Sequence, residues 1–220
     1  MFKDRKDAAL QLAEALKEYR NTSVLVLGIP RGGAETAYYV ARDLHAELSL
    51  LVARKLGHPK NPEYAAGALA EDGSIYLNPD VRGELSPETI DELAQQQQEE
   101  IVRRIKILRK GEPLPPLKNR VVILVDDGIA TGATLYAAIA LCKKQGAARI
   151  VVAAPVSGRD KKRELLAEVD EVVILETPSF YHAVSQAYES FYNLTDEEAR
   201  GFLERWQKER ATEDTTAETE

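Results

Sequence analysis

A pair of adjacent carboxylates followed by a loop of small and hydroxyl residues is the part of this sequence best suited to chemistry. Asp126 and Asp127 come directly after the apolar run Val121–Val125, and the loop 128–134 follows them. A short run of Val, Ile and Leu is typical of an interior strand of a parallel sheet, covered on both faces. Apolar residues then recur at helical spacing over 135–145, so the loop forms a strand-to-helix turn.

This turn is suited to binding a phosphate. The first amide groups of a helix have no partner within the helix and lie at the positive end of its dipole. Gly132 and Ala133 let an anion approach the backbone, while Thr131 and Thr134 can add hydroxyl donors or cap the helix. The two carboxylates can accept hydrogen bonds from a vicinal diol or bind a divalent cation, and ribose 5-phosphate offers both a diol and a phosphate. The alternative is that the acids only solubilise a strand end and Thr131 is an ordinary cap.

A second turn has the composition of an anion site. The segment 28–33, with the sequence GIPRGG, follows the apolar run 24–27 and opens a helical pattern. Pro30, Arg31, Gly32 and Gly33 combine exposed amides, flexible backbone and a cation, which suits a diphosphate. A tight turn that simply needs glycine is the competing interpretation.

The strand, the acid pair and the TG-x-T loop resemble the signature of the type I phosphoribosyltransferases, which bind 5-phosphoribosyl 1-diphosphate (PRPP). The resemblance implies that Asp126 and Asp127 contact the ribose hydroxyls, with Mg2+ arriving with PRPP near them, and that the loop binds the 5-phosphate. Hypoxanthine-guanine members have an aspartate where this chain has Ala130, whereas adenine and uracil members have alanine. The loop residues that would bind PRPP are Gly128, Ala130, Thr131, Gly132, Ala133 and Thr134.

The resemblance also assigns roles to three other segments. The turn 30–33 would bind the diphosphate, and an unusual peptide is frequent there in the family, so we expect a cis or otherwise unusual peptide near Arg31. Arg54 and Lys55 would stabilise the departing diphosphate, ahead of a flexible loop over about 55–66. A hood over about 176–194 would cover a base, with Phe180 and Tyr181 against it; the alternative is an aromatic cluster that packs the edge of the fold.

These features predict an enzyme that transfers the phosphoribosyl group of PRPP to a nucleobase or related nitrogen acceptor, with Mg2+, and releases diphosphate. Positioning and electrostatics would supply the rate, without a protein nucleophile. A regulator that senses PRPP without catalysis is the main alternative, and a hydrolase of a ribosyl phosphate is a third. The sequence has neither GxxxxGK[ST] nor a GxGxxG after its first strand, which argues against a P-loop NTPase and a dinucleotide-binding fold.

Strand and helix patterns alternate along the chain and predict an α/β fold with a central parallel sheet flanked by helices, which binds its ligands at the carboxyl ends of the strands. Thr195 and Glu198 have the spacing of a capping box at the start of the last helix. One domain over 1–210, including the hood, would hold all of these elements. The expected helices cover 4–19, 34–44, 87–110, 135–145 and 195–207, and the expected strands cover 24–27, 48–54, 121–125, 149–156 and 171–175, with short β-like runs near 66–69 and 74–77.

Composition sets limits on the function. The chain has 220 residues, 44% of them hydrophobic, which is enough for a sizeable core. Four acids and no base in 211–220 contribute more than half of the net charge of −7 and predict a disordered acidic tail. The absence of a long basic run argues against nucleic acid as a partner, and the basic residues of 103–110 are typical of a solvated helix face. No apolar stretch is long enough to cross a bilayer, so we expect a cytoplasmic protein with small-molecule partners and leave a homodimer open.

Overall fold

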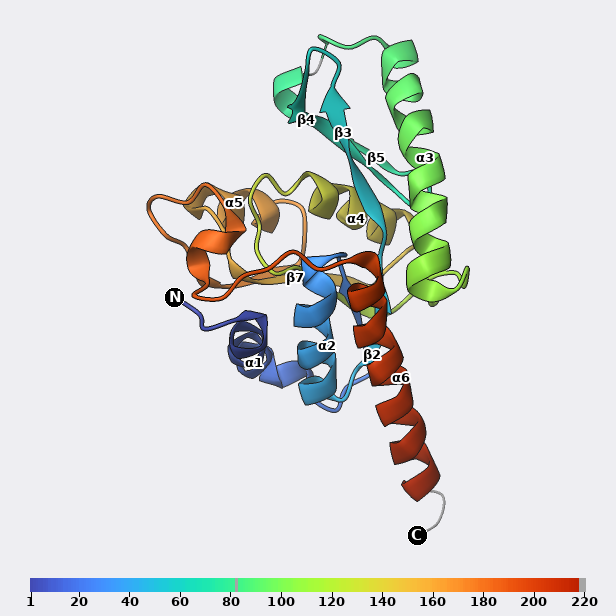
Figure 1. The fold of residues 1–220 in the computed structure, drawn as a ribbon, viewed down its shortest axis with the longest axis vertical. Helices are drawn as coiled ribbons and strands as arrows, with labels where there is room; N and C mark the ends of the chain where they lie inside the picture. The colour runs from blue at the N-terminus through green and yellow to red at the C-terminus, as the bar shows by residue number, and fades with distance from the viewer. Residues whose placement is uncertain (82, 218–220) are drawn as a thin grey trace.

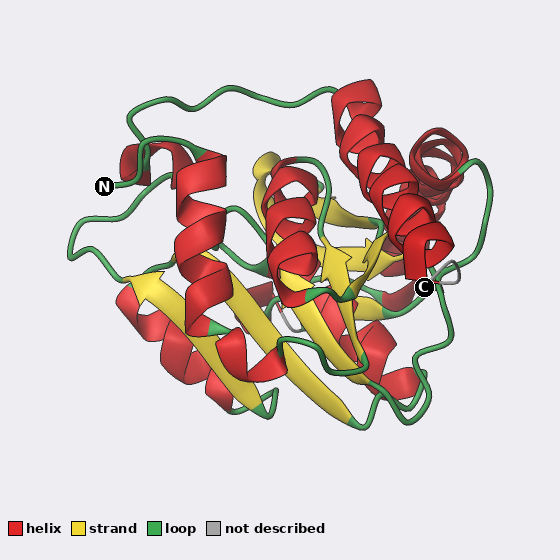
Figure 2. Cartoon of the chain, turned by 90° about the horizontal axis from the view of Figure 1, so that it is seen from below, coloured by secondary structure: helices red, strands yellow, loops and turns green. Residues whose placement is uncertain are grey.

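A five-stranded parallel sheet forms the centre of the computed structural model, which describes residues 1–81 and 83–217. The strand order is β2-β1-β6-β7-β8, and each neighbouring pair is parallel. Helices cover both faces of this sheet (Figure 2), which confirms the expected α/β architecture. The strands are β1 (Val24–Gly28), β2 (Glu47–Leu50), β6 (Val121–Val125), β7 (Arg149–Val156) and β8 (Glu171–Glu176).

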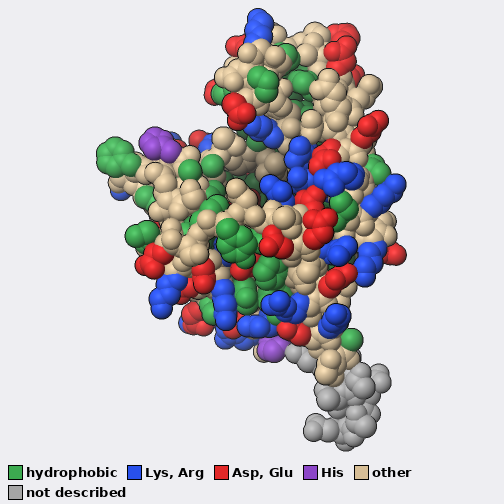
Figure 3. All heavy atoms as spheres, viewed as in Figure 1, with side chains coloured by type: hydrophobic (Ala, Val, Ile, Leu, Met, Phe, Trp, Pro, Cys, Tyr) green, Lys and Arg blue, Asp and Glu red, His purple; other side chains and the backbone are tan. Residues whose placement is uncertain are grey.

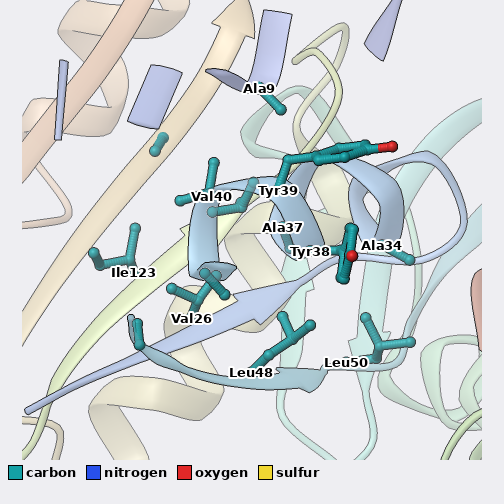
Figure 4. Close-up of a cluster of buried hydrophobic side chains, with 14 of the residues drawn as sticks. Ala9, Val26, Ala34, Ala37, Tyr38, Tyr39, Val40, Leu48, Leu50 and Ile123 are labelled. Atoms are coloured by element: carbon teal, nitrogen blue, oxygen red, sulfur yellow. The ribbon is translucent and has the colours of Figure 1, made fainter. Parts of the chain in front are cut away.

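Alternate residues of the strands build two separate cores. Val26, Leu48 and Ile123 point to the face covered by α1 (Arg5–Ala15), α2 (Gly32–Leu44) and α6 (Asp196–Ala217) (Figure 4). Leu25, Val122 and Leu124 point to the opposite face, which is covered by α4 (Ala133–Lys144) and α5 (Arg159–Leu166). Each fully buried Leu, Ile or Val stabilises the fold by roughly 1.5–3 kcal/mol relative to an exposed position. The two cores fix the strand ends, where the candidate ligand residues lie.

A three-stranded antiparallel sheet forms a second layer at the upper end of the molecule in Figure 1. Its strands are β3 (Ala53–His58), β4 (Asn61–Ala70) and β5 (Ile75–Leu77), and it lies between α3 (Pro87–Arg109) and α4. Two expectations are therefore wrong. The strand expected over 48–54 is two strands in different sheets, and the flexible loop expected over about 55–66 is a hairpin.

Glycine and proline residues favour a loop in the sequence, but in this hairpin several of them lie within paired strands. A Cβ atom on Gly67 would lie 2.1 Å from the carbonyl oxygen of Tyr76, so only glycine allows β4 and β5 to approach this closely. Pro62 lies near the hairpin turn, where the register shifts on both sides of Gly57. The strand also breaks after β2, because the amide of Val52 donates to the Glu71 carboxylate (2.8 Å) and not to a neighbouring strand.

Arg109 joins the two sheets, which corrects the expectation of a solvated basic face over 103–110. Its side chain is 3% exposed, and its guanidinium donates to both Glu71 (2.6 Å) and the carbonyl oxygen of Leu50 (2.6 Å). Other basic residues of α3 do reach the surface: Figure 3 shows Lys and Arg side chains interspersed with Asp and Glu side chains on that face. Part of this cluster is thus structural.

The C-terminal helix α6 is longer than the sequence pattern indicated. It begins with the expected capping box, because the Glu198 amide donates to Thr195 Oγ1 (3.1 Å) and the Thr195 amide donates to Glu198 Oε2 (2.7 Å). It then continues through Ala217 and projects beyond the body of the molecule (Figure 1). The expected disordered tail 211–220 is thus helical through Ala217, and 218–220 lie outside the described residues. No glycine or proline occurs after Gly201, and Lys, Glu, Arg and Ala sustain a helix.

None of the helices within the described ranges is both long enough and apolar enough to span a membrane.

Candidate active site

The two predicted anion turns lie side by side at one edge of the parallel sheet. Gly28, the last residue of β1, pairs with Val125, the last residue of β6. The Ile29 amide then donates to the carbonyl oxygen of Val125 (2.9 Å), so the turn after β1 stays against the turn after β6. The helices α2 and α4 begin at this edge. Segments about 100 residues apart in the sequence therefore meet, as the carboxyl-end rule for parallel sheets predicts.

The acid pair packs directly onto the glycine turn. A Cβ atom on Gly32 would lie 1.8 Å from Asp127 Oδ2, and one on Gly33 would lie 3.0 Å from Asp126 Oδ1. Any side chain at Gly32 would displace the Asp127 carboxylate, so glycine is required there for close approach. The peptide between Pro30 and Arg31 is cis, which confirms the expected unusual peptide near Arg31.

Asp127 is held by a buried arginine. Arg5 Nε donates to Asp127 Oδ2 (2.8 Å), and the side chains of these residues are 3% and 11% exposed. The same guanidinium donates to the carbonyl oxygen of Tyr192 (2.8 Å) and lies 4.1 Å from the ring centroid of Phe191. Helix α1 and the end of the hood are thus tied to the acid pair. Asp127 thus has a cationic partner within the chain, and the expected contact of both acids with the ribose hydroxyls stays a prediction.

The role of Arg5 was missed, although the sequence carries a signal for it. Arg5 lies at helical spacing with Ala8, Ala9 and Leu12, all of which are buried in α1. A cation on the apolar stripe of an amphipathic helix must find a buried partner. The partner itself could not be named, because it lies 122 residues away in the sequence.

Asp126 is the more available of the two acids. It is half-buried, and its Oδ1 atom accepts a hydrogen bond from the Asp127 amide (2.9 Å). Burial, and then the charge of Asp127, raises the pKa of Asp126 well above its ordinary value. A ligand that brings hydroxyl donors or a cation to this carboxylate would favour its charged form.

The loop 128–134 leaves the start of α4 open to an anion. Gly132 has a φ of 76° and caps α4 without a side-chain hydrogen bond. Thr131 and Ala130 are exposed, and Thr131 Oγ1 reaches the Ala133 amide only at 3.5 Å. Ala133 and Thr134 form the first turn of the helix. Their amides lie at the positive end of the helix dipole, and the phosphate site expected here stays a prediction.

The structure does not bring Arg54 and Lys55 to the acid pair. Both lie within β3, where successive side chains point to opposite faces of the sheet. Arg54 Nε donates to Gln97 of α3 (3.2 Å), while Lys55 Nζ donates to the carbonyl oxygen of Glu63 (3.1 Å). Burial, followed by the charge of Arg104, lowers the pKa of Arg54. Their expected role depended on a strand that ended at Arg54, and this strand continues to His58.

A cavity of about 590 Å³ lies beside the phosphate loop. Its wall is formed by three segments: the loop after β6, the start of α5 and the hood. Tyr181 lines this cavity, whereas Phe180 does not and is 85% exposed. Of the two aromatics predicted to contact a base, Tyr181 thus lies at the cavity and Phe180 lies outside it. Its lining includes Ala130, Thr131, Arg159, Lys161, Ser179 and Tyr181, together with the carboxylates of Asp160 and Glu164.

The hood is fastened to the N-terminal residues. The Phe2 amide donates to the carbonyl oxygen of Ala187, and the Glu189 amide donates to that of Phe2, both at 2.8 Å. Tyr188 packs its ring 5.7 Å from that of Phe2 and donates its hydroxyl to the backbone oxygen of Asp127. The aromatic cluster thus has a structural role at Tyr188. No pattern in the sequence indicated that Phe2 contributes to it.

The residues fit a Mg2+ ion only when a substrate supplies further ligands. Within residues 1–81 and 83–217, the structure has no group of three or more acidic, His or Cys side chains placed to hold a metal ion. Asp127 is occupied by Arg5, so Asp126 is the carboxylate left to contribute. Mg2+ is commonly held by one or two carboxylates together with substrate phosphates and waters, and this donor set fits that pattern.

Comparisons with known proteins indicate the family of this chain. A family model described as a phosphoribosyl transferase domain matches residues 2–190. A Mycobacterium tuberculosis protein named "Putative phosphoribosyl transferase Rv0571c" is 44% identical over 207 residues, covering 93% of this chain and 47% of the relative. The chain thus spans about half the length of that relative. The crystal structure of TT1426 from Thermus thermophilus has a TM-score of 0.81 and 38% identity, covering 93% of this chain and 98% of that one.

Proposed function

This chain belongs to the phosphoribosyl transferase domain family, and on that premise we propose that it transfers the phosphoribosyl group of PRPP to a nitrogen acceptor in the presence of Mg2+. The observation that carries the proposal is the meeting of two helix starts, at Gly32 and Ala133, that lack a side-chain cap, with the half-buried Asp126 packed against Gly33 of the first. A ribose with a phosphate at one end and a diphosphate at the other matches this order of groups.

The residues of this chain have separate tasks in the proposed reaction. The amides at the start of α4 and the Thr131 hydroxyl bind the 5-phosphate, and Asp126 accepts hydrogen bonds from the ribose hydroxyls. The turn 30–33 binds the diphosphate through its amides and the exposed Arg31. Asp127, held by Arg5, positions the glycine turn against the acid pair. When bound with PRPP, Mg2+ supplies positive charge that offsets the charge of the diphosphate.

The bond changes need no protein nucleophile. The C1–O bond to diphosphate breaks, and its electron pair leaves with the diphosphate. The lone pair of the acceptor nitrogen forms the new C1–N bond. The proton of that nitrogen passes to water or to the diphosphate, because Ala130 offers no basic group in the loop.

One observation favours a second candidate, a PRPP-sensing protein without catalysis. Arg54 and Lys55, which the resemblance assigns to the departing diphosphate, contact Gln97 and Glu63 instead. A site that binds PRPP but leaves the diphosphate charge without these cations would bind its ligand and not turn it over.

Two measurements on the purified chain test these candidates. Calorimetry with PRPP and Mg2+ reports binding, and an assay of diphosphate release with each of a panel of purine, pyrimidine and pyridine bases reports transfer. The proposal expects heat on PRPP addition and base-dependent diphosphate release. Binding without release with any base would favour the sensor, and the absence of binding heat would reject both candidates.

A further inference from the structure

We propose that the cavity beside the phosphate loop takes an acceptor ring that carries a carboxylate, and that Arg159 binds this carboxylate. The inference rests on the proposed function, because it names the class of acceptor for the same site. It depends on three features: the position of the cavity, the lack of an acidic partner for Arg159 among the described residues and the geometry of the guanidinium.

The cavity adjoins the place where the ribose would lie. Its near wall is formed by Ala130 and Thr131 of the phosphate loop, and its far wall by Arg159 and the hood. The chain after β7 lies against the chain after β6, because Ile129 and Ser157 form a parallel bridge and the Ile129 amide donates to the carbonyl oxygen of Val156 (2.9 Å). A ring placed here faces a ribose bound to the loop.

Arg159 is a cation without an acidic partner. Its Nη2 atom donates to Ser179 Oγ (3.0 Å), and within the described part of the chain no carboxylate oxygen lies within 4.0 Å of its guanidinium. The other cation of the wall, Lys161, is paired with Glu164 at 2.6 Å. The acid next to Arg159, Asp160, is 81% exposed and lies 3.6 Å from Arg163 instead. The exposed Arg159 therefore keeps most of its donors for a ligand.

A second donor in the same wall lacks a partner. The Tyr181 hydroxyl is buried, and none of the described residues forms a hydrogen bond with it. It lies 3.1 Å from the position of a Cβ atom on Gly128, and therefore close to the acid pair. Buried polar atoms are nearly always hydrogen-bonded in native structures, so this hydroxyl has an unmet hydrogen bond, which it can complete as a donor or as an acceptor.

Two carboxylates also line the cavity, but Glu164 is paired with Lys161 and Asp160 lies 3.6 Å from Arg163, so Arg159 is the cation of this wall that lacks an acidic partner among the described residues. A ring that presents an amino group would place a donor against this guanidinium, whereas a carboxylate supplies two acceptor oxygens and a negative charge. The planar fork of a guanidinium matches the two oxygens of a carboxylate, and such charge-assisted pairs are about twice as strong as neutral hydrogen bonds. These properties select an acidic acceptor over a neutral one of the same size.

Matched pairs of acceptors test the inference. Diphosphate release is measured with PRPP, Mg2+ and either uracil or uracil 6-carboxylate, and with either pyridine-3-carboxamide or pyridine-3-carboxylate. We expect kcat/KM to be about tenfold higher, or more, for the better carboxylate than for its neutral partner. In Arg159→Ala this ratio falls toward one, and in Arg159→Lys, which keeps the charge but loses the fork, it falls part of the way.

Lys162→Ala is the control, because Lys162 is an exposed cation on the same helix and does not line the cavity. It should leave the ratio unchanged. Equal kcat/KM values within both pairs, or a ratio that Arg159→Ala does not change, would overturn the inference while leaving the transferase proposal intact.

A binding measurement separates failure of this inference from failure of the proposed function. If no base releases diphosphate, the transferase proposal fails, and the same four compounds are titrated calorimetrically into the PRPP-loaded protein. Tighter binding of the carboxylates in the wild type, and its loss in Arg159→Ala, would still support the inference. Equal or undetectable binding of all four would reject it.

Discussion

The edge of the parallel sheet and the three-stranded layer both contain clustered charges, but the two regions use them differently. At the sheet edge, Asp126 and the amides at the start of α4 have few partners among the residues that the structure describes. In the three-stranded layer, Arg109 and Glu71 are buried and paired with one another. Polar groups left unsatisfied by folding are available to a ligand, whereas satisfied ones hold the fold together. A cluster of charges therefore does not by itself distinguish a ligand site from an ion pair that stabilises the fold.

The largest effect on stability should come from breaking the buried ion pair between Arg109 and Glu71. Arg109→Met leaves the Glu71 carboxylate buried without its cation, so we expect a loss of about 3–5 kcal/mol in the free energy of unfolding. Urea denaturation of the variant and the wild type measures this loss. The double variant Arg109→Met/Glu71→Gln removes the stranded charge and should recover part of it. A single variant within about 1 kcal/mol of the wild type would contradict the structural role.

The next largest effect concerns the sheet edge and appears in activity rather than stability. Asp126→Asn keeps the shape of the side chain but loses the charge and one acceptor, so diphosphate release should fall on the order of 100-fold. The thermal midpoint should not decrease, because no cation is left unpaired. Asp91→Asn, the same change at an exposed position of α3, is the control and should have no effect on release. Unchanged release in Asp126→Asn would remove this carboxylate from the proposed reaction.

The raised pKa of Asp126 gives a smaller effect that depends on pH. Because burial raises this pKa in the folded state, the folded protein binds the proton more tightly than the unfolded chain does. The contribution of this group to the free energy of unfolding is fully present below the unfolded pKa of about 3.9. It is lost as the pH rises through the folded pKa, with a slope of at most about 1.4 kcal/mol for each pH unit.

Urea denaturation at a series of pH values measures that loss, with Asp126→Asn as the reference that lacks the titrating group. The wild type should become less stable relative to the variant as the pH rises. A constant difference between the two proteins across the series would contradict the raised pKa.

The same comparison explains which parts of the molecule the sequence could predict. Strand β6 and the loop after it depend on neighbours in the sequence: an apolar run, two acids and a helix start. The hairpin β3–β4 depends on partners such as Ala53 and Ala70, and its glycine and proline residues have local preferences that favour a loop.

Asp127 shows a second limit of sequence reasoning. Asp126 and Asp127 are identical residues side by side, and only the folded chain shows that Arg5 pairs with the second one. The division of roles between them is a property of the tertiary structure. The pattern of α1 could have shown that Arg5 is buried, but not which acid neutralises it.

The smallest effect is expected for an exposed ion pair whose N–O distance is nearly the same as that of the buried pair. Lys143 and Glu168 are separated by 2.7 Å, almost the same as the 2.6 Å between Arg109 and Glu71, but their side chains are 48% and 49% exposed rather than 3% and 8%. Water already solvates both exposed charges, and holding two long side chains in place costs entropy, so Lys143→Ala should cost about 0.5 kcal/mol or less. Urea denaturation at low and high salt checks this value, since the small contribution of a surface pair should fall further as salt screens it. A loss approaching that of Arg109→Met would mean that the distance between the charges, and not their burial, decides how strongly an ion pair supports this fold.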